Sequence, residues 1–319
     1  MEERGLETQG TAEMRLLDLL LRDLPFSESE LKTLVRTAPH RYKVYGVPKR
    51  SGKGFRLIAQ PSPEIKLLQR WVTVHVLSKY PIHSAAMAYR TNIGIRENAA
   101  KHVRQRFLLK MDFKDFFPSI KALDFAQHTQ KYAPEFEEDI LPLTYILFRK
   151  PKKTTDFILS IGAPSSPVVS NTIVYDLDVA ISRYTSGNRI IYTRYADDLI
   201  FSTNDSGVLK ELYEFVKEIC KHLNYPQLTL NFDKTVFSSR KWNRTVTGLV
   251  LSNDQKVSIG WEKKRELRGQ IHRYLTGQLA AEDIAKLRGY LAFVRDVEPT
   301  LFEKCKDKVP PARRAELFG

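Results

Sequence analysis

Two adjacent carboxylates, Asp197 and Asp198, lie at the centre of the stretch 190–203. Apolar, aromatic and β-branched residues flank them on both sides at a density typical of strands, which predicts two antiparallel strands with the acidic pair at their tight junction. Two ionised carboxylates held side by side repel each other, so this arrangement costs stability unless a cation neutralises them. A polar turn without chemistry is the alternative interpretation.

A third carboxylate, Asp112, ends the apolar stretch 107–112, and Pro118 marks the turn that follows. We expect this stretch to be a strand of the same sheet as the acidic hairpin. Asp112 and Asp197 could then hold two Mg²⁺ ions, because this hard cation prefers oxygen ligands. Two such ions activate the attacking hydroxyl and stabilise the leaving oxygen in phosphoryl transfer. Asp115 is a weaker candidate near a triphosphate and could instead be a helix N-cap.

The charge of the chain indicates a polyanionic partner. The 319 residues carry a formal net charge of +14 and have a pI near 9.6, which suits nucleic acid, although a solvated basic surface would look similar. Cys220 and Cys305 match no disulfide or zinc spacing, as expected in a reducing cytosol. No apolar run approaches the length of a membrane span, and the start of the chain does not resemble a signal peptide. We therefore expect a cytoplasmic protein.

The N-terminal part should be scaffold followed by a mobile hairpin. A leucine-rich helix is expected over about 12–24, and Ser27 with Glu30 forms a capping box that opens a second helix. The stretch 42–58 predicts a β-hairpin with a Gly/Lys-rich tip, packed on a helix over 64–79. Lys49 and Arg56 on this hairpin suit phosphate contact, whereas a solvated basic turn is the alternative.

Further along, a glycine-proline turn at 161–167 leads into a helix expected over 168–183. Gly162 would let the backbone approach a ligand. The predicted order is a strand at 107–112, that helix, strands at 190–195 and 199–203, a helix at 207–223 and a strand at 228–232. This order is typical of the split βαβ unit of a ferredoxin-like palm. Lys234 follows it and could protonate departing pyrophosphate, though a surface lysine is the plainer interpretation.

The C-terminal part is basic and helical. Residues 240–319 contain 17 Lys or Arg against 10 Asp or Glu. Apolar residues at helical spacing predict helices over 262–275 and 281–294. A basic helical end of this kind suits a thumb that grips the backbone of a duplex.

Taken together, these motifs resemble the retron reverse transcriptases of bacteria over nearly the whole chain. Residues 98–102 match the Asn-Ala-x-x-His element of that family, and residues 246–248 match its Val-Thr-Gly element. General reverse transcriptase motifs are matched by 111–118, by 162–167, by the Tyr-Ala-Asp-Asp sequence at 195–198, and by Asn231 with Lys234. The resemblance implies an α+β, right-hand polymerase fold with fingers, a ferredoxin-like palm and a helical thumb. We expect N-terminal helices and fingers over 1–105, interleaved with a palm over 106–250, and a thumb over 251–319.

The resemblance also implies an activity and its site, namely Mg²⁺-dependent, RNA-directed DNA polymerisation. The implied catalytic residues and metal ligands are Asp112, Asp197 and Asp198, with Phe113 beside the metal. Phe117 falls where related enzymes carry the aromatic ring that excludes ribonucleotides. The expected nucleotide-binding residues are Lys49, Arg56, Asp115, Phe116, Phe117, Gly162 and Lys234. The expected RNA-binding residues are Asn98, His102, Val246, Thr247, Gly248, Lys263, Lys264, Arg265 and Arg268.

The implied partners are deoxynucleoside triphosphates, a cognate non-coding RNA that serves as template and primer, its DNA product, and a retron effector protein. A 2′-hydroxyl of the RNA would prime synthesis, which gives a branched RNA–DNA product (msDNA) in antiphage defence. One residue departs from the family pattern: Ile161 precedes Gly162, where related enzymes usually have glutamine. This puts the usual amide contact to the nucleotide in doubt but removes no metal ligand.

Two other classes of protein compete with this interpretation. A group II intron-type enzyme would also be a reverse transcriptase, but it would need DNA-binding or endonuclease modules after the thumb, and the sequence stops at Gly319. A non-catalytic RNA-binding protein on a decayed polymerase fold should have lost one of the three aspartates. All three are present, which favours catalysis.

Overall fold

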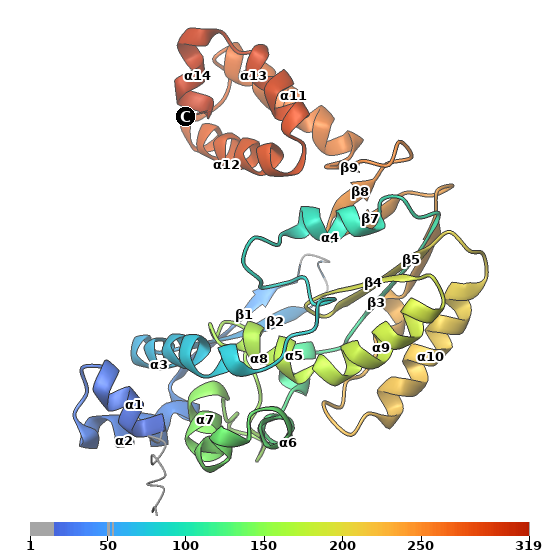
Figure 1. The fold of residues 1–319 in the computed structure, drawn as a ribbon. Coiled ribbons are helices and arrows are strands. Elements are labelled where there is room, and N and C mark those ends of the chain that lie inside the picture. The colour runs from blue at the N-terminus through green and yellow to red at the C-terminus, as the bar shows by residue number, and fades with distance from the viewer. Residues whose placement is uncertain (1–15, 50–51, 53, 319) are drawn as a thin grey trace, which may run out of the picture. The chain divides into compact units, whose positions relative to one another are not determined.

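The computed structural model describes residues 16–49, 52 and 54–318 as an α+β fold (Figure 1). Two compact units interleave along the chain. The first comprises residues up to Ile82, Asp115–Tyr175 and Leu223–Leu228, and the second comprises His83–Lys114, Asp176–His222 and the chain from Thr229 onward. None of the helices in the described part of the chain is long and apolar enough to cross a membrane.

The first unit contains the predicted hairpin and short helices. Strands β1 (Tyr42–Pro48) and β2 (Phe55–Pro61) pair antiparallel, as expected, and the predicted capping box of Ser27 and Glu30 is formed. Residues 12–15 of the first predicted helix, and residues 50, 51 and 53 of the hairpin tip, lie outside the described residues. The helices of this unit are α1 (Leu16–Asp23), α2 (Glu28–Thr37), α3 (Pro63–His75), α5 (Phe116–Ser119), α6 (Ala122–Tyr132), α7 (Ile140–Leu147) and α8 (Ser166–Ile173), with 3₁₀ turns at Ala38–His40, Leu77–Lys79 and Pro134–Asp139.

The second unit is built on a four-stranded antiparallel sheet in the order β4-β5-β3-β6. Its strands are β3 (Phe107–Asp112), β4 (Ile191–Tyr195), β5 (Asp198–Thr203) and β6 (Val236–Ser239). Helices α9 (Tyr175–Gly187) and α10 (Val208–His222) run along one face of the sheet (Figure 1). The apolar stripe of α10 is buried, including Leu209, Leu212 and Val216, because helical periodicity places these residues on the side that meets the sheet.

Two predictions for this region are wrong in detail. The strand predicted at 228–232 is absent, and Leu230 makes a single β-bridge to Phe113 before a 3₁₀ turn at Phe232–Lys234. The fourth strand is β6 instead, since the chain first turns to bring Asn231 and Lys234 to Asp112. The helix predicted at 168–183 is two helices, α8 and α9, which are separated at Val174.

The remainder of the second unit packs around one hydrophobic cluster. A small sheet of β7 (Arg244–Val246), β8 (Leu249–Leu251) and β9 (Val257–Ser258) contacts α4 (Ile95–His102). Thr247 and Gly248 both have positive φ, which fits a two-residue hairpin turn of the type favoured by strand twist. Helices α11 (Trp261–Leu275), α12 (Ala281–Val297), α13 (Pro299–Asp307) and α14 (Pro311–Phe318) follow. The predicted helices over 262–275 and 281–294 are thus confirmed, and their apolar residues join Val246 and Leu249 in the cluster.

Candidate active site

The three predicted aspartates meet at one end of the four-stranded sheet. Tyr195 ends β4 and Asp198 begins β5, so Ala196 and Asp197 form the tight turn between them. Ala196 takes the left-handed conformation that such a turn requires, with φ of +58°. On the neighbouring strand, Asp112 lies directly opposite Asp198, and directly opposed side chains share one face of a sheet at about 5 Å between their Cβ atoms.

The electrostatics of this end of the sheet favour a bound cation. Burial first, and then the nearby charges of Asp197 and Asp112, raise the pKa of Asp198 to about 6, although Lys110 and Lys234 act in the opposite direction. Asp112 is only 6% exposed. The Lys234 ammonium lies 2.8 Å from Asp112 Oδ2, and the Asn231 amide donates to Asp112 Oδ1 at 3.3 Å. Burial opposes the charge of Lys234, yet its hydrogen bond to Asp112 and the attraction of the other aspartates raise its pKa.

No ready-made group of three or more His, Cys, Asp or Glu side chains poised to hold a metal ion occurs among the described residues. The donor set nevertheless fits a hard cation, because it offers carboxylate oxygens whose mutual repulsion a cation would relieve. The Lys234 ammonium supplies a positive charge at Asp112 in this structure. A metal ion would therefore compete with Lys234 for Asp112. The Phe113 ring is buried and its N–H donates to the Asp197 carbonyl at 3.2 Å, so Phe113 could offer a metal only its backbone carbonyl.

A buried ion pair supports the acidic turn, and sequence analysis missed it. Arg194 and Asp178 are both completely buried and lie 2.7 Å apart, and the Tyr192 hydroxyl donates to the same carboxylate at 2.6 Å. Another N–H of Arg194 donates to the Ala196 carbonyl at 3.2 Å. The only signal in the sequence was Arg194 itself, an arginine within an apolar stretch that predicts a strand. A cation there needs a buried counter-charge, and Asp178 on α9 supplies it.

The predicted nucleotide-binding residues other than Lys234 belong to the first unit. Lys49 and Arg56 are exposed on the β1–β2 hairpin. Asp115 precedes α5 with φ of +44° and makes no side-chain cap, while Phe116 is buried and its ring meets the half-buried Phe117 ring edge-on at 5.4 Å. Lys234 differs from these residues, because it lies in the second unit and forms an ion pair with Asp112.

The backbone at position 162 requires glycine. Its φ of +111° is one that residues with a side chain rarely adopt, and a Cβ there would come within 3.1 Å of Ile58 Cγ2. The neighbouring Ile161 carbonyl accepts a hydrogen bond from the Ala59 N–H at 2.8 Å. The turn is therefore fastened to β2 through its backbone, which does not depend on the side chain at position 161.

The predicted RNA contacts of Asn98, His102 and Val246 need correction. All three residues are 0% exposed, so their side chains have no surface to offer an RNA. His102 lies between the hydroxyls of Ser202 and Thr193, at 2.7 Å from each, and burial lowers its pKa to about 3, so the ring is neutral. It joins α4 to β4 and β5. The side-chain amide of Asn98 finds no hydrogen-bond partner among the described residues.

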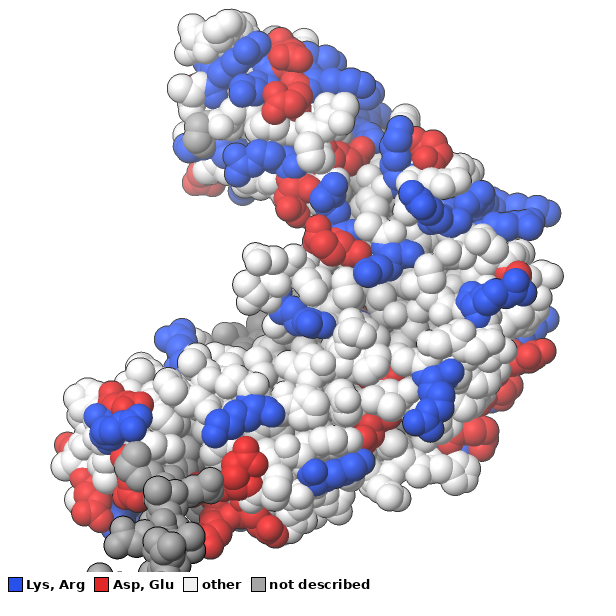
Figure 2. Space-filling view, viewed as in Figure 1, with Lys and Arg blue, Asp and Glu red and all other residues white. Residues whose placement is uncertain are grey.

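The other predicted RNA contacts are not buried, although Thr247 and Lys264 are half-buried and Lys264 is paired with Glu298. The Thr247 hydroxyl donates to the Ile95 carbonyl at 3.2 Å, which fastens the β7–β8 turn to α4, and Gly248 is exposed. Lys263, Arg265 and Arg268 are exposed on α11. Figure 2 shows Lys and Arg side chains spread over α11–α14 and the β7–β9 region, with fewer acidic side chains between them.

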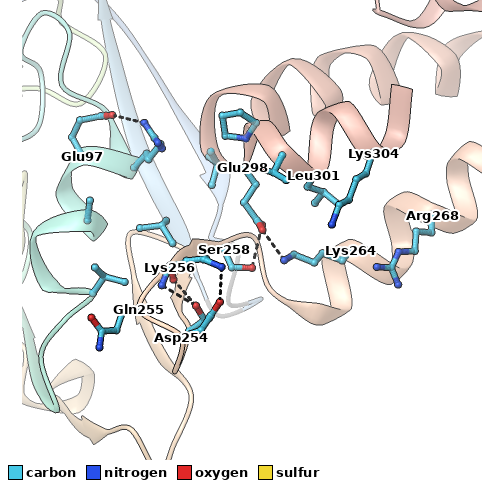
Figure 3. Close-up of a pocket in the computed structure, with 18 residues that line it drawn as sticks. Glu97, Asp254, Gln255, Lys256, Ser258, Lys264, Arg268, Glu298, Leu301 and Lys304 are labelled. Carbon is cyan, nitrogen blue, oxygen red and sulfur yellow. Dashed lines mark hydrogen bonds and ion pairs between the residues drawn. The ribbon is translucent and has the colours of Figure 1, made fainter. Parts of the chain in front are cut away.

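A cavity of about 790 Å³ lies between α4, the β8–β9 turn, α11 and the start of α13 (Figure 3). Glu298 closes it on one side by accepting hydrogen bonds from Ser258 Oγ, from the Ile259 N–H and from Lys264 Nζ. The other two acidic side chains of the lining are also paired, Glu97 with Arg96 and Asp254 with Lys256. Arg268 and Lys304 line the cavity and form no ion pair within the described chain. These two cations are left to attract an anion.

Comparison with known proteins gives relatives along most of the chain. Residues 47–259 match the family described as reverse transcriptase (RNA-dependent DNA polymerase). The retron Ec83 reverse transcriptase of Escherichia coli is 38% identical over 277 residues, which is 86% of this chain and 88% of that protein. The retron Ec86 reverse transcriptase of Escherichia coli is 34% identical over 92% of this chain and 88% of that protein.

Among solved structures, the telomerase of Candida tropicalis in complex with a fragment of telomeric RNA aligns with a TM-score of 0.49 at 12% identity. The alignment covers 91% of this chain and 58% of the telomerase. The chain thus spans little more than half the length of that structure.

Proposed function

The chain belongs to the reverse transcriptase family and is an RNA-directed DNA polymerase of the retron type, and we propose that it copies one cognate non-coding RNA into branched RNA–DNA. In this proposal a 2′-hydroxyl of that RNA is the primer and the product is msDNA. The observation that carries the proposal is the position of Asp112 directly opposite Asp198, with Asp197 in the adjoining turn.

The proposed chemistry assigns a task to each residue of the site. Asp112, Asp197, Asp198 and the Phe113 carbonyl would hold two Mg²⁺ ions, which activate the attacking hydroxyl and stabilise the charge on the leaving oxygen when bound. Lys234 holds Asp112 in place and carries a proton at Nζ that it can give to departing pyrophosphate. Lys49 and Arg56 supply positive charge to the triphosphate. The Gly162 turn, Asp115 and Phe116 also belong to the proposed nucleotide site, and Phe117 excludes the ribose 2′-hydroxyl.

We assign recognition of the RNA to the surface around the Thr247–Gly248 turn and to the thumb, which we place at residues 251–319 after fingers (1–105) and palm (106–250). Lys263, Arg265 and Arg268 present exposed cations along one helix. Arg268 and Lys304 add unpaired positive charge at the cavity beside α4. Double-stranded RNA is read mainly by its shape and its phosphates, which is what such a surface offers.

The biological setting follows from the relatives alone. The similar proteins are retron reverse transcriptases, so the proposal extends to an effector protein as partner and to antiphage defence. A group II intron-type enzyme is the competing proposal, and the identity to retron enzymes argues against it. A non-catalytic RNA-binding protein would have no reason to keep three aspartates together at the end of one sheet.

The branched product provides the direct test. The DNA beside the gene is first searched for a structured RNA. That RNA is transcribed and incubated with the protein, Mg²⁺ and deoxynucleotides, and a series of RNAs carrying one 2′-deoxy substitution each is then compared. We expect a substitution at a single position to abolish synthesis. Efficient extension of every substituted RNA from its 3′ end would contradict 2′ priming while leaving polymerase activity intact. The Asp198→Asn protein is the matched negative control.

A chimera tests where the RNA is recognised. Residues 246–319 are exchanged for the same region of a related retron enzyme, and both cognate RNAs are assayed. We expect the chimera to initiate on the RNA of the enzyme that donated the segment. Initiation only on the original RNA would place specificity outside this region. Salt-sensitive binding does not decide the question, because any basic thumb shows it.

A further inference from the structure

Exposed aromatic rings and cations gather at the edge strand β6 and the loops beside it. We name this the β6-edge surface and define it by Arg106, Lys210, Phe237, Arg240, Lys241 and Trp242, of which Arg240 is half-buried and the other five are exposed. Trp242 is 75% exposed and Phe237 is 49% exposed. A large apolar ring in water is unfavourable by itself, so two exposed rings that line one cavity indicate a surface that is covered in use.

This surface lies away from the aspartates. Successive side chains of a strand point to opposite faces, so Phe107 and Leu109 point away from the face that carries Asp112. Phe237 lies directly opposite Leu109 and shares its face. Phe107 and Asp112 stand at opposite ends of β3, about 16 Å apart along the strand. The β6-edge surface is therefore on the α10 side and at the opposite end of the sheet from the polymerase site.

A shallow cavity of about 280 Å³ is part of the surface. It is lined by Phe107 and Phe237 from the sheet, by Leu209 and Lys210 from α10, and by Trp242. Phe237 packs edge-on against Tyr213 of α10 at 5.9 Å between ring centroids, and the Arg106 guanidinium lies 5.5 Å from the centre of the Phe107 ring. The cavity thus has aromatic walls with cations at its rim.

The loop that carries Trp242 is held in place. The Arg240 N–H donates to the Arg106 carbonyl at 3.0 Å, and its guanidinium donates to the Arg104 carbonyl at 2.8 Å. The Trp242 N–H closes a turn onto the Ser239 carbonyl at 2.9 Å. Because these bonds order the backbone before any ligand arrives, a ligand pays less conformational entropy on binding.

The charge of this region is unbalanced. Arg104, Arg106, Lys210, Arg240, Lys241 and Arg244 form no ion pair within the described chain. The one acidic residue of the cavity lining, Asp205, is paired with Arg189 at 3.2 Å. Arg244 is 1% exposed and donates to the carbonyls of Gln105 and Leu251. Burial lowers its pKa, and repulsion from Arg240 lowers it further. A polyanion would relieve the repulsion.

We propose that the β6-edge surface binds single-stranded nucleic acid, with an unpaired base stacked on Trp242 and phosphates contacted by Arg106, Lys210 and Lys241. Aromatic rings interleaved with cations are the standard means of holding single strands, because every base has a face to stack and every linkage carries a charge. A duplex offers no free base face along its length. A protein partner would need acidic groups opposite these cations, and nothing on this chain selects for that. The proposal goes beyond the polymerase reaction, since it adds a second nucleic-acid site on another face of the second unit.

Tryptophan fluorescence can locate the bound strand. The chain has three tryptophans; Trp71 is buried, whereas Trp242 and Trp261 are exposed. In a Trp261→Ala protein, Trp242 is the remaining exposed tryptophan, so the fluorescence of an exposed ring comes from Trp242. We expect single-stranded DNA or RNA of about 12 nucleotides to quench this emission, and an equally long blunt duplex to leave it nearly unchanged. Trp261, which lies on α11 under Arg265, is the matched control in a Trp242→Ala protein.

Affinity is measured next by anisotropy of a labelled 12-nucleotide strand, without Mg²⁺ or deoxynucleotides and in an Asp198→Asn background. We expect Trp242→Ala to weaken binding by about tenfold, the scale of one lost stacking contact. The double variant Arg106→Ala/Lys241→Ala should lower the slope of log K against log salt by about 1.4. These residues are exposed, so the variants should fold, and thermal unfolding checks this.

The outcomes are decisive in both directions. No quenching of Trp242 by single strands, or equal quenching by the duplex, overturns the proposal, and loss of affinity on Trp261→Ala alone would place the strand on the thumb instead. A protein partner that quenches Trp242 when oligonucleotides do not would assign the surface to protein binding. Because the assay uses no nucleotides and a catalytically impaired protein, its result is independent of whether branched DNA is made.

Discussion

Arg194 and Asp178 form an ion pair in which neither side chain is exposed, and the same guanidinium also donates to the carbonyl of Ala196. The pair thus connects helix α9 to the turn that carries Asp197. A buried pair is not in itself strong evidence for stability, because removing both charges from water costs about as much as their attraction returns. Its geometry instead indicates a role in fixing the position of the acidic turn.

We therefore expect Asp178→Asn to be strongly destabilising. The change keeps the shape of the side chain but leaves Arg194 buried without a counter-charge, which should lower the free energy of unfolding by about 3–5 kcal/mol. Urea denaturation followed by circular dichroism measures this. The control is Glu28→Gln, which breaks the exposed pair with Lys32 and should change little. Equal effects of the two substitutions would show that the buried pair has no special weight.

Asp197→Asn and Asp198→Asn should each abolish DNA synthesis while leaving RNA affinity nearly intact. A carboxamide cannot supply the anionic oxygen that a metal pair requires. Asp198→Asn also removes one of three like charges, so thermal stability near neutral pH should stay level or rise. Primer extension with Mg²⁺ and a thermal melt measure the two quantities. Near wild-type synthesis by either variant would refute the metal-ligand assignment.

Phe117→Ala should admit ribonucleotides. If the ring of Phe117 lies under the sugar, its removal opens space for a 2′-hydroxyl, and discrimination between the two nucleotide types should fall by about tenfold or more. Single-nucleotide incorporation compares the two substrates. The neighbouring Phe116, which is buried against Phe117, provides the control Phe116→Leu, which should cost stability but not selectivity. Unchanged discrimination in Phe117→Ala would make Phe117 a packing residue.

The hairpin at 190–203 could be predicted from sequence because the information is local. Strand formers on both sides of Asp197 and Asp198 leave one place for a turn, and the antiparallel pairing follows. The helices α11 and α12 were predictable for the same reason, since their apolar spacing sets which side is buried. Asp112 needed one further step, the assumption that two distant strands pair, and the register with Asp198 confirms it.

Features that depend on tertiary contacts were missed. The apolar run at 228–232 has strand-like composition, but the turn that brings Lys234 to Asp112 takes its place. Asn98 and His102 look like polar surface residues, yet both are fully buried. The hydroxyls that share hydrogen bonds with His102 come from strands about a hundred residues away. Periodicity cannot reveal a partner that far along the chain.

The burial of His102 makes a prediction about pH. Its pKa in the folded protein is lowered to about 3, whereas an unfolded histidine titrates near about 6.5. Between these values the unfolded chain binds the extra proton and the folded chain does not. The free energy of unfolding should therefore fall as the pH is lowered below about 6.5, by up to about 1.4 kcal/mol per pH unit from this residue.

Urea denaturation of wild type and His102→Gln between pH 5 and pH 7 isolates this contribution as the difference between the two proteins, because other groups that titrate in that range, such as Asp198 with its pKa of about 6, are present in both. His102→Gln should lower stability at pH 7, since glutamine cannot bridge the Ser202 and Thr193 hydroxyls in the same way. It should also flatten the dependence on pH, because the variant lacks the buried ring that gains a proton only on unfolding. His222→Gln, at the exposed end of α10, is the control and should keep the wild-type slope. Identical slopes in all three proteins would mean that His102 gains a proton without unfolding, and that the contact between α4 and the sheet opens on its own.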